Sequence, residues 1–142
     1  NFLYYEFISQ NPLVYWADSK VSLGLVQSYY PTNISQTIGD FYFPNQQAFA
    51  NTGWIGSGYA NGGVSGLFIY SIMLGIFFSM LNVLAKYVDT NIIISVLFPS
   101  LISLLISSDF FASFLTHGVL LSFILLLFTF LKNSSKLKMK AK

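Results

Sequence analysis

The fold is decided by residues 64–85, VSGLFIYSIMLGIFFSMLNVLA, a run without a charged side chain that ends at Lys86. At about 1.5 Å per residue, a helix of this length measures roughly 33 Å and matches a bilayer hydrocarbon core of about 30 Å. Two further uncharged runs follow at 91–108 and 110–131, and His117 is the one titratable side chain within them. We therefore predict three membrane-spanning helices, at 64–85, 91–108 and 110–131.

The composition agrees with a lipid environment. Hydrophobic residues make up 54% of the 142-residue chain and charged residues only 8%, against about 25% in an ordinary soluble domain. Charged residues at this low level cannot form the surface of a soluble fold of this size. We therefore expect lipid to cover much of the exterior. The chain has no cysteine and one histidine, so neither a thiolate nor a zinc site is expected, and no metal or cofactor is predicted.

Residues 1–63 have a different character. They hold both tryptophans, more than half of the aromatic residues and three of the four prolines. No window is long and apolar enough to cross a bilayer. Because prolines interrupt the segment, we expect short helices separated by turns, near 2–10, 18–28 and 45–51.

The lysines predict an orientation. Five of the seven lie in the tail 132–142, and Lys86 lies in the connector 86–90 between the first two predicted helices. Positive residues stay on the cytoplasmic side, so the tail is predicted to be cytoplasmic and residues 1–63 extracytoplasmic. The tail is short and adjoins an apolar run, so it does not indicate nucleic-acid binding.

The predicted helices carry faces suited to close packing. Ser71, Gly75 and Ser79 recur every four residues and form a small-residue stripe along the first of them. Three such helices need more neighbours than this chain supplies. We therefore expect a segment of a longer protein, with further transmembrane helices upstream, or an oligomer.

A glycine-rich stretch, NTGWIGSGYANGGVSG at 51–66, precedes the first predicted span. Its spacing fits neither a dinucleotide-binding fingerprint nor a phosphate-binding P-loop. One interpretation is an anion site of backbone N–H groups at a helix N-terminus. The other is that the glycines permit tight re-entry into the membrane and close helix contact. The substrate-binding residues expected under the first interpretation are Asn51, Gly53, Trp54, Gly56 and Gly58.

The aromatic side chains of residues 1–63 lie among amides and hydroxyls, a mixture that suits a sugar. Apolar walls with a few polar groups are typical of ligand sites, and sugar faces stack on aromatic rings. The alternative is an interfacial belt, in which Trp and Tyr lie at the level of the lipid headgroups.

Three polar residues are spaced four apart near the third predicted span. If 110–131 is a single helix, Asp109, Ser113 and His117 lie on one face, and about 12 Å then separates Asp109 from His117, which excludes a hydrolase triad. His117 is a candidate general base or phosphate ligand, because an ionisable group in a membrane helix indicates function by default. The alternative is a neutral imidazole bonded to a neighbouring helix.

Few other charges are predicted outside the membrane. Glu6, Asp18 and Asp40 are carboxylates that could act as an acid or a base, although surface solvation is the simpler role. Lys20 is the one cation in residues 1–63. We therefore expect Lys20, together with Asp109, to bind substrate.

Several short motifs carry a family resemblance. They are Tyr4-Tyr5-Glu6-Phe7, Asn11-Pro12, Ser19-Lys20, residues 50–60, residues 63–66, Ser108-Asp109-Phe110-Phe111 and Thr116-His117-Gly118. On these motifs the chain resembles the C-terminal part of Wzy-type polymerases of O-antigen and capsule repeat units, and the resemblance extends over essentially the whole chain.

The resemblance implies a polytopic, all-helical bacterial plasma-membrane enzyme of the GT-C-like class. Such an enzyme is an inverting glycosyltransferase that moves a glycan from undecaprenyl diphosphate onto a lipid-linked repeat unit. The family has many more spans than three and is expected to hold the diphosphate with external arginines, whereas this chain has no arginine. Those residues would lie upstream, and this segment alone would be inactive.

Under this hypothesis His117 or Glu6 removes the proton of the acceptor hydroxyl, and Lys20 with the 51–58 backbone holds the leaving charge. The main alternative is a non-enzymatic membrane subunit that binds glycan or partner proteins in a polysaccharide export complex. A transporter fragment is less expected, because the apolar runs contain one ionisable residue.

Overall fold

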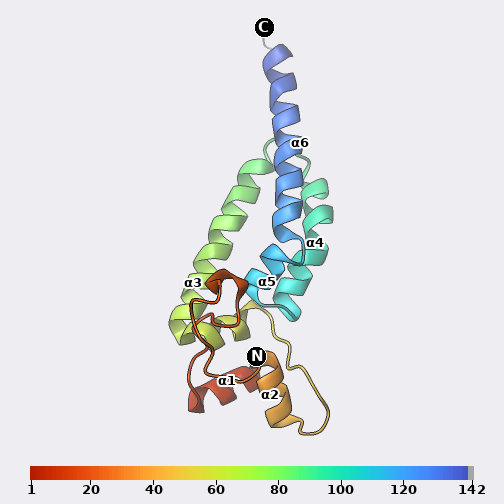
Figure 1. Cartoon of the computed structure of the whole chain (residues 1–142). Coiled ribbons are helices and arrows are strands. Elements are labelled where there is room, and N and C mark those ends of the chain that lie inside the picture. The colour runs from red at the N-terminus through yellow and green to blue at the C-terminus, as the bar shows by residue number, and fades with distance from the viewer. Residues whose placement is uncertain (141–142) are drawn as a thin grey trace.

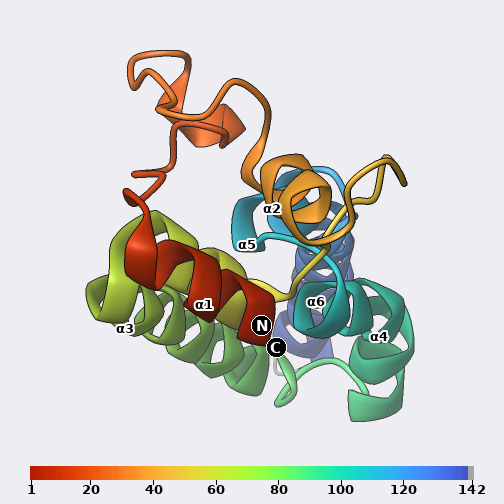
Figure 2. The same cartoon turned by 90° about the horizontal axis from the view of Figure 1, so that it is seen from below.

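The computed structural model describes residues 1–140, and this part of the chain is helical, with no strand. Long helices α3, α4 and α6 run alongside one another, and α1 and α2 gather at the end away from the C-terminus (Figure 1). Viewed along the molecule from that end, α1 lies across α3 (Figure 2). The elements are α1 (Phe2–Gln10), η1 (Lys20–Ser22), α2 (Ile34–Tyr42), α3 (Trp54–Leu84), α4 (Thr90–Ile106), α5 (Phe110–Leu115) and α6 (Val119–Lys140).

Helix α3 is the one helix of the described chain that is long and apolar enough to cross a membrane. Only 22% of its most apolar window is buried within the described chain. Large apolar side chains face outward along it: Phe68, Ile69, Ile72, Ile76, Phe78 and Val83. Helix α4 and the apolar part of α6, Val119–Leu131, are shorter apolar helices, so the structure supports one of the three predicted spans by length and composition.

Helix α3 is interrupted at two glycines. Gly62 (φ −143°, ψ 15°) and Gly63 (φ 60°, ψ −141°) leave the helical region, and a positive φ with this ψ is open to glycine alone. The pieces on either side approach closely, since a Cβ on Gly66 would lie 2.0 Å from the Gly58 carbonyl oxygen. The continuous part of α3 therefore begins at Val64, where the first span was predicted to begin.

The break in α3 frees backbone carbonyls that the N-terminal segment then satisfies. Val14 N donates to the Ala60 carbonyl at 2.9 Å, and Tyr15 N donates to the Asn61 carbonyl at 3.1 Å. A buried carbonyl without a partner would be costly, so these two bonds stabilise both the break and the loop that crosses it.

The prediction of one helix over 110–131 is wrong. Helix α5 ends at Leu115, Gly118 takes a φ of +87°, and α6 begins at Val119. Because His117 lies in this turn, it does not continue the helical face of Asp109 and Ser113. The predicted tail 132–142 continues α6 as far as Lys140, and residues 141–142 lie outside the described chain.

The short helices were predicted in part. Helix α1 is confirmed at 2–10, whereas the predicted helix at 18–28 is only the single turn η1 and the one at 45–51 does not form. A helix forms instead at α2, which Asn33 caps by accepting a hydrogen bond from Gln36 N at 2.9 Å.

Three apolar clusters hold the molecule together. One joins α3, α4 and α6 around Phe77 and Leu97. Another joins α1, α2 and the start of α3 around Ile38. The third joins α3, α4 and α5 around Tyr70 and Phe110. The candidate site lies near the N-terminal ends of α3 and α5.

Candidate functional site

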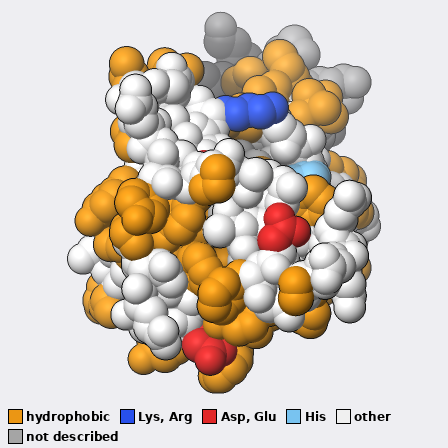
Figure 3. Space-filling model, turned by 60° about the horizontal axis from the view of Figure 1, so that its bottom comes forward, with side chains coloured by type: hydrophobic (Ala, Val, Ile, Leu, Met, Phe, Trp, Pro, Cys, Tyr) orange, Lys and Arg blue, Asp and Glu red, His pale blue; other side chains and the backbone are white. Residues whose placement is uncertain are grey.

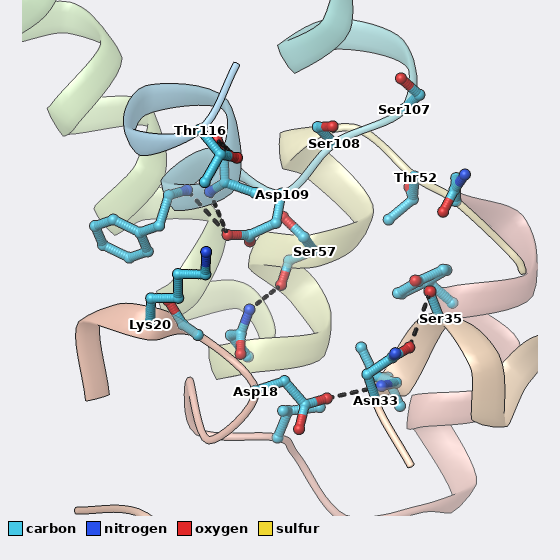
Figure 4. Close-up of a pocket in the computed structure, with 18 of the residues that line it drawn as sticks. Asp18, Lys20, Asn33, Ser35, Thr52, Ser57, Ser107, Ser108, Asp109 and Thr116 are labelled. Atoms are coloured by element: carbon cyan, nitrogen blue, oxygen red, sulfur yellow. Dashed lines mark hydrogen bonds between the residues drawn. The ribbon is translucent and has the colours of Figure 1, made fainter. Parts of the chain in front are cut away.

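A cavity of about 350 Å³ opens where the loop before η1, the start of α2, the start of α3 and the N-terminal end of α5 meet (Figure 4). One cation, Lys20, and two carboxylates, Asp18 and Asp109, line it. Most of its other polar groups are uncharged hydroxyls and amides: Ser19, Ser35, Thr52, Ser57, Ser107, Ser108, Thr116, Asn33, Asn51 and Asn61. With the bottom of the molecule turned forward, the visible face carries hydrophobic patches and only isolated charges (Figure 3).

Asp109 is held in a defined orientation at the start of α5. Its Oδ2 accepts hydrogen bonds from Phe111 N at 2.9 Å and Ala112 N at 3.4 Å, which caps the helix. Its Oδ1 accepts a third bond, from the Tyr70 hydroxyl, at 3.1 Å. The carboxylate is therefore a fixed part of the cavity wall.

A hydrogen-bonded chain anchors the loop that carries Asp18 and Lys20. Trp16 Nε1 donates to the Tyr70 oxygen at 3.0 Å, Trp16 N donates to Asn61 Oδ1 at 2.9 Å, and Asn61 Nδ2 donates to the Ser57 carbonyl at 2.9 Å. Tyr70 is fully buried, and its ring stacks on Phe110 with centroids 4.9 Å apart. The loop is thereby fixed against α3 and α5.

The charged residues of this loop differ in their partners. Asp18 Oδ2 accepts a hydrogen bond from Ile34 N, at the start of α2, at 2.7 Å. Lys20 is exposed, and its side chain points toward Asp109 (Figure 4). Among the described side chains no carboxylate lies within ion-pair distance of Lys20, so its charge is available to a ligand in the cavity.

Burial changes the acidity of a tyrosine in the cavity wall. Tyr4 lines the cavity and is buried. Loss of water, followed by the negative charges of Asp109 and Asp18, raises the pKa of the Tyr4 phenol well above its usual range. Tyr4 therefore stays neutral at physiological pH.

The structure brings together three of the seven residues predicted to bind substrate: Lys20, Asn51 and Asp109 line the cavity. Gly53, Trp54, Gly56 and Gly58 do not. Sequence reasoning did not single out Ser107, Thr52 or Asn61 as ligand-binding residues, because only the tertiary fold places their side chains around one space.

The positions of the glycines support close packing, the second interpretation of the stretch. A Cβ on Gly53 would lie 2.1 Å from the Leu105 carbonyl oxygen, and one on Gly58 would lie 3.1 Å from the Tyr70 ring. The N–H of Gly56 already donates to Asn1 Oδ1 at 2.8 Å. This N–H group is therefore not exposed to bind an anion.

The two predicted proton acceptors lie outside the cavity lining. Glu6 is on α1 beside Tyr42, where the loss of water and then the hydrogen bond and charge of Glu6 raise the pKa of the Tyr42 phenol. His117 shares a 2.9 Å hydrogen bond between its Nε2 and Ser108 Oγ, and Ser108 does line the cavity. No group of three metal-ligating side chains comes together in the described chain.

An apolar hollow of about 250 Å³ lies on the other side of α5. Phe110 and Phe114 line this hollow, whereas Phe111 and Leu115 line the polar cavity. Residues of α3 and α6 complete the hollow: Met73, Ile76, Phe77, Met80, Leu120 and Phe123. Helix α5 is therefore a wall between a polar and an apolar space.

Fold and site together define a helical protein with at least one helix suited to a membrane and a polar cavity beside that helix's N-terminal end. No protein family, curated protein or solved structure matches this chain. A function is therefore inferred from the chemistry of the cavity and from the family resemblance in the sequence.

Proposed function

We propose that this chain is the C-terminal part of a membrane polysaccharide polymerase that transfers an undecaprenyl-diphosphate-linked glycan onto a lipid-linked repeat unit. The observation that carries the proposal is the arrangement around α5, with a polar cavity on one side and an apolar hollow on the other. Such a pair of spaces suits an amphiphilic substrate, whose head needs hydrogen bonds and whose hydrocarbon tail needs an apolar surface.

In the proposed topology α3, α4 and α6 cross the bacterial plasma membrane, and α1 and α2 lie outside it. The outward-facing apolar side chains of α3 support this arrangement, because they have no cover within the described chain. The lysines near the C-terminal end would lie on the cytoplasmic side. The cavity then opens at the extracytoplasmic surface, where the family's reaction takes place.

The polar lining suits a sugar diphosphate. Hydroxyls and amides can exchange hydrogen bonds with sugar hydroxyls, and the fixed Asp109 carboxylate can accept one. Lys20, with no ion pair of its own, can stabilise the charge that develops on the diphosphate as it leaves. Arginines from the remainder of the protein would add to this charge.

One observation favours the alternative, a non-enzymatic membrane subunit that binds glycan. Neither Glu6 nor His117 lines the cavity, so no predicted proton acceptor touches a bound sugar directly. A cavity of hydroxyls and amides is sufficient for binding without transfer.

Reconstitution of the full-length protein in liposomes with lipid-linked repeat units tests the proposal. We expect polymer from the wild type and a strong loss in Lys20→Ala. Lys86→Ala is the matched control, because this exposed lysine lies in the connector before α4, outside the cavity. If the wild type binds the repeat unit but makes no polymer, the polymerase proposal is wrong and the glycan-binding subunit is the better explanation.

A further inference from the structure

We propose that Ser108 relays a proton from a sugar hydroxyl bound in the cavity to His117. This inference rests on the proposed function and extends it by naming the group that touches the acceptor hydroxyl. The observation behind it is that His117 lies outside the cavity lining but is hydrogen bonded to a residue within it.

The hydrogen-bond geometry around Ser108 fits a relay. Ser103 Oγ donates to Ser108 Oγ at 3.3 Å, and His117 Nε2 lies 2.9 Å from the same oxygen. A hydroxyl has one hydrogen and two lone pairs. With one lone pair occupied by Ser103, the Ser108 hydrogen can point to an unprotonated Nε2, which leaves the second lone pair for a proton from the cavity.

The turn between α5 and α6 positions the imidazole. Gly118, at a φ of +87°, reverses the chain, and Ser100 Oγ donates to the His117 carbonyl at 2.7 Å. The break in the third apolar segment therefore carries His117 back to Ser108, nine positions earlier in the chain. The His117 side chain is exposed, so a proton that it accepts can pass on to water.

The two carboxylates of the cavity have structural partners. Asp109 accepts bonds from two backbone N–H groups and from Tyr70, and Asp18 accepts one from Ile34 N. These bonds fix both carboxylates in the cavity wall, whereas Ser108 is the lining residue from which a proton can pass to an imidazole.

The acceptor oxygen forms a bond to the anomeric carbon of the donor sugar, and the bond from that carbon to the diphosphate oxygen breaks with its electron pair on the diphosphate. The acceptor proton moves to Ser108 Oγ, while the Ser108 proton moves to His117 Nε2. The imidazolium then releases its proton to water, and the pair is ready for the next sugar.

The test measures kcat and KM of the reconstituted full-length protein for the addition of one repeat unit. We expect Ser108→Ala to lower kcat by about 10²–10⁴-fold with little change in KM, which is the usual range for a general base. His117→Ala should lower kcat equally, and the double variant should lower it no further, because the two residues act as one unit. Ser108→Thr keeps the hydroxyl and should retain most of the activity.

Ser95→Ala is the matched control. Ser95 is exposed on α4 and lies outside the cavity lining, and its hydroxyl makes no hydrogen bond within the described chain. Equal effects of Ser95→Ala and Ser108→Ala, or a double variant whose activity falls by the product of the two single losses, would overturn the relay and leave the polymerase proposal in place. A wild type that makes no polymer would overturn both.

Discussion

The Tyr70 hydroxyl donates a 3.1 Å hydrogen bond to the Asp109 carboxylate, and the two residues lie 39 positions apart in the chain. The same Tyr70 oxygen accepts a bond from Trp16 Nε1. One fully buried phenol therefore joins the N-terminal loop, α3 and α5. Because Asp18 and Lys20 lie two and four positions after Trp16 in the same loop, the shape of the cavity depends on this phenol.

Removing the Tyr70 hydroxyl should destabilise the protein. In Tyr70→Phe the ring still packs on Phe110, but Trp16 Nε1 loses its acceptor and Asp109 Oδ1 loses its donor. We expect a loss of about 1–3 kcal/mol, measured as thermal unfolding in detergent. Tyr5→Phe is the control, since Tyr5 is exposed and its hydroxyl makes no hydrogen bond in the described chain. Equal melting temperatures for the two variants would contradict the role of Tyr70.

The glycine break in α3 should not tolerate a side chain. Gly63→Ala places a Cβ where φ is +60° and ψ is −141°, and we expect a loss of about 1–3 kcal/mol for this conformation. Gly75→Ala in the same helix is the matched substitution, because a Cβ there meets nothing within 4 Å. Alanine favours a helix over glycine by about 1 kcal/mol, so Gly75→Ala should be neutral or stabilising. Thermal unfolding in detergent compares the two variants. An unchanged melting temperature in Gly63→Ala would contradict the positive φ at Gly63.

Replacing either of two buried serines, Ser113 of α5 or Ser100 of α4, should change the melting temperature in opposite directions. Ser113 is fully buried, and its hydroxyl has no hydrogen-bond partner in the described chain. Ser113→Ala should therefore be neutral or raise the melting temperature, since an unpaired buried hydroxyl costs about 1–3 kcal/mol. Ser100→Ala should lower it, because the Ser100 hydroxyl holds the His117 carbonyl. A marked loss of stability in Ser113→Ala would show that the hydroxyl has a partner.

The proposed topology can be tested by cysteine labelling, because the chain has no cysteine of its own. Gln27→Cys lies in the exposed loop before α2 and should react with an impermeant maleimide in intact cells. Lys86→Cys lies in the connector between α3 and α4 and should react only after the membrane is permeabilised. Labelling of Lys86→Cys from outside intact cells would reverse the orientation.

Local patterns in the sequence predicted some elements well. The start of the continuous apolar helix at Val64 and the helix at 2–10 were both correct. Length, charge and glycine content are local properties, so they can be read without knowing the neighbours. Helix α2 was missed, although its cap at Asn33 is also a local signal.

The break at 116–118 is a different case. Glycine is common inside membrane helices, so Gly118 alone did not indicate an end. Whether such a glycine stays helical depends on contacts from elsewhere in the chain, here the bond from Ser100 to the His117 carbonyl. The consequence is functional, because this turn brings His117 to Ser108.

The sequence by itself determined that this protein is helical and that its apolar side chains need to be covered by something other than water. Only the tertiary structure decided that Lys20, Asn51 and Asp109 share a cavity and that the glycines between them serve packing. The physical reason is the distance in sequence over which the interactions act. Helix formation and apolar character arise from neighbouring residues. The cavity depends on hydrogen bonds between positions tens of residues apart, such as that from Trp16 to Tyr70.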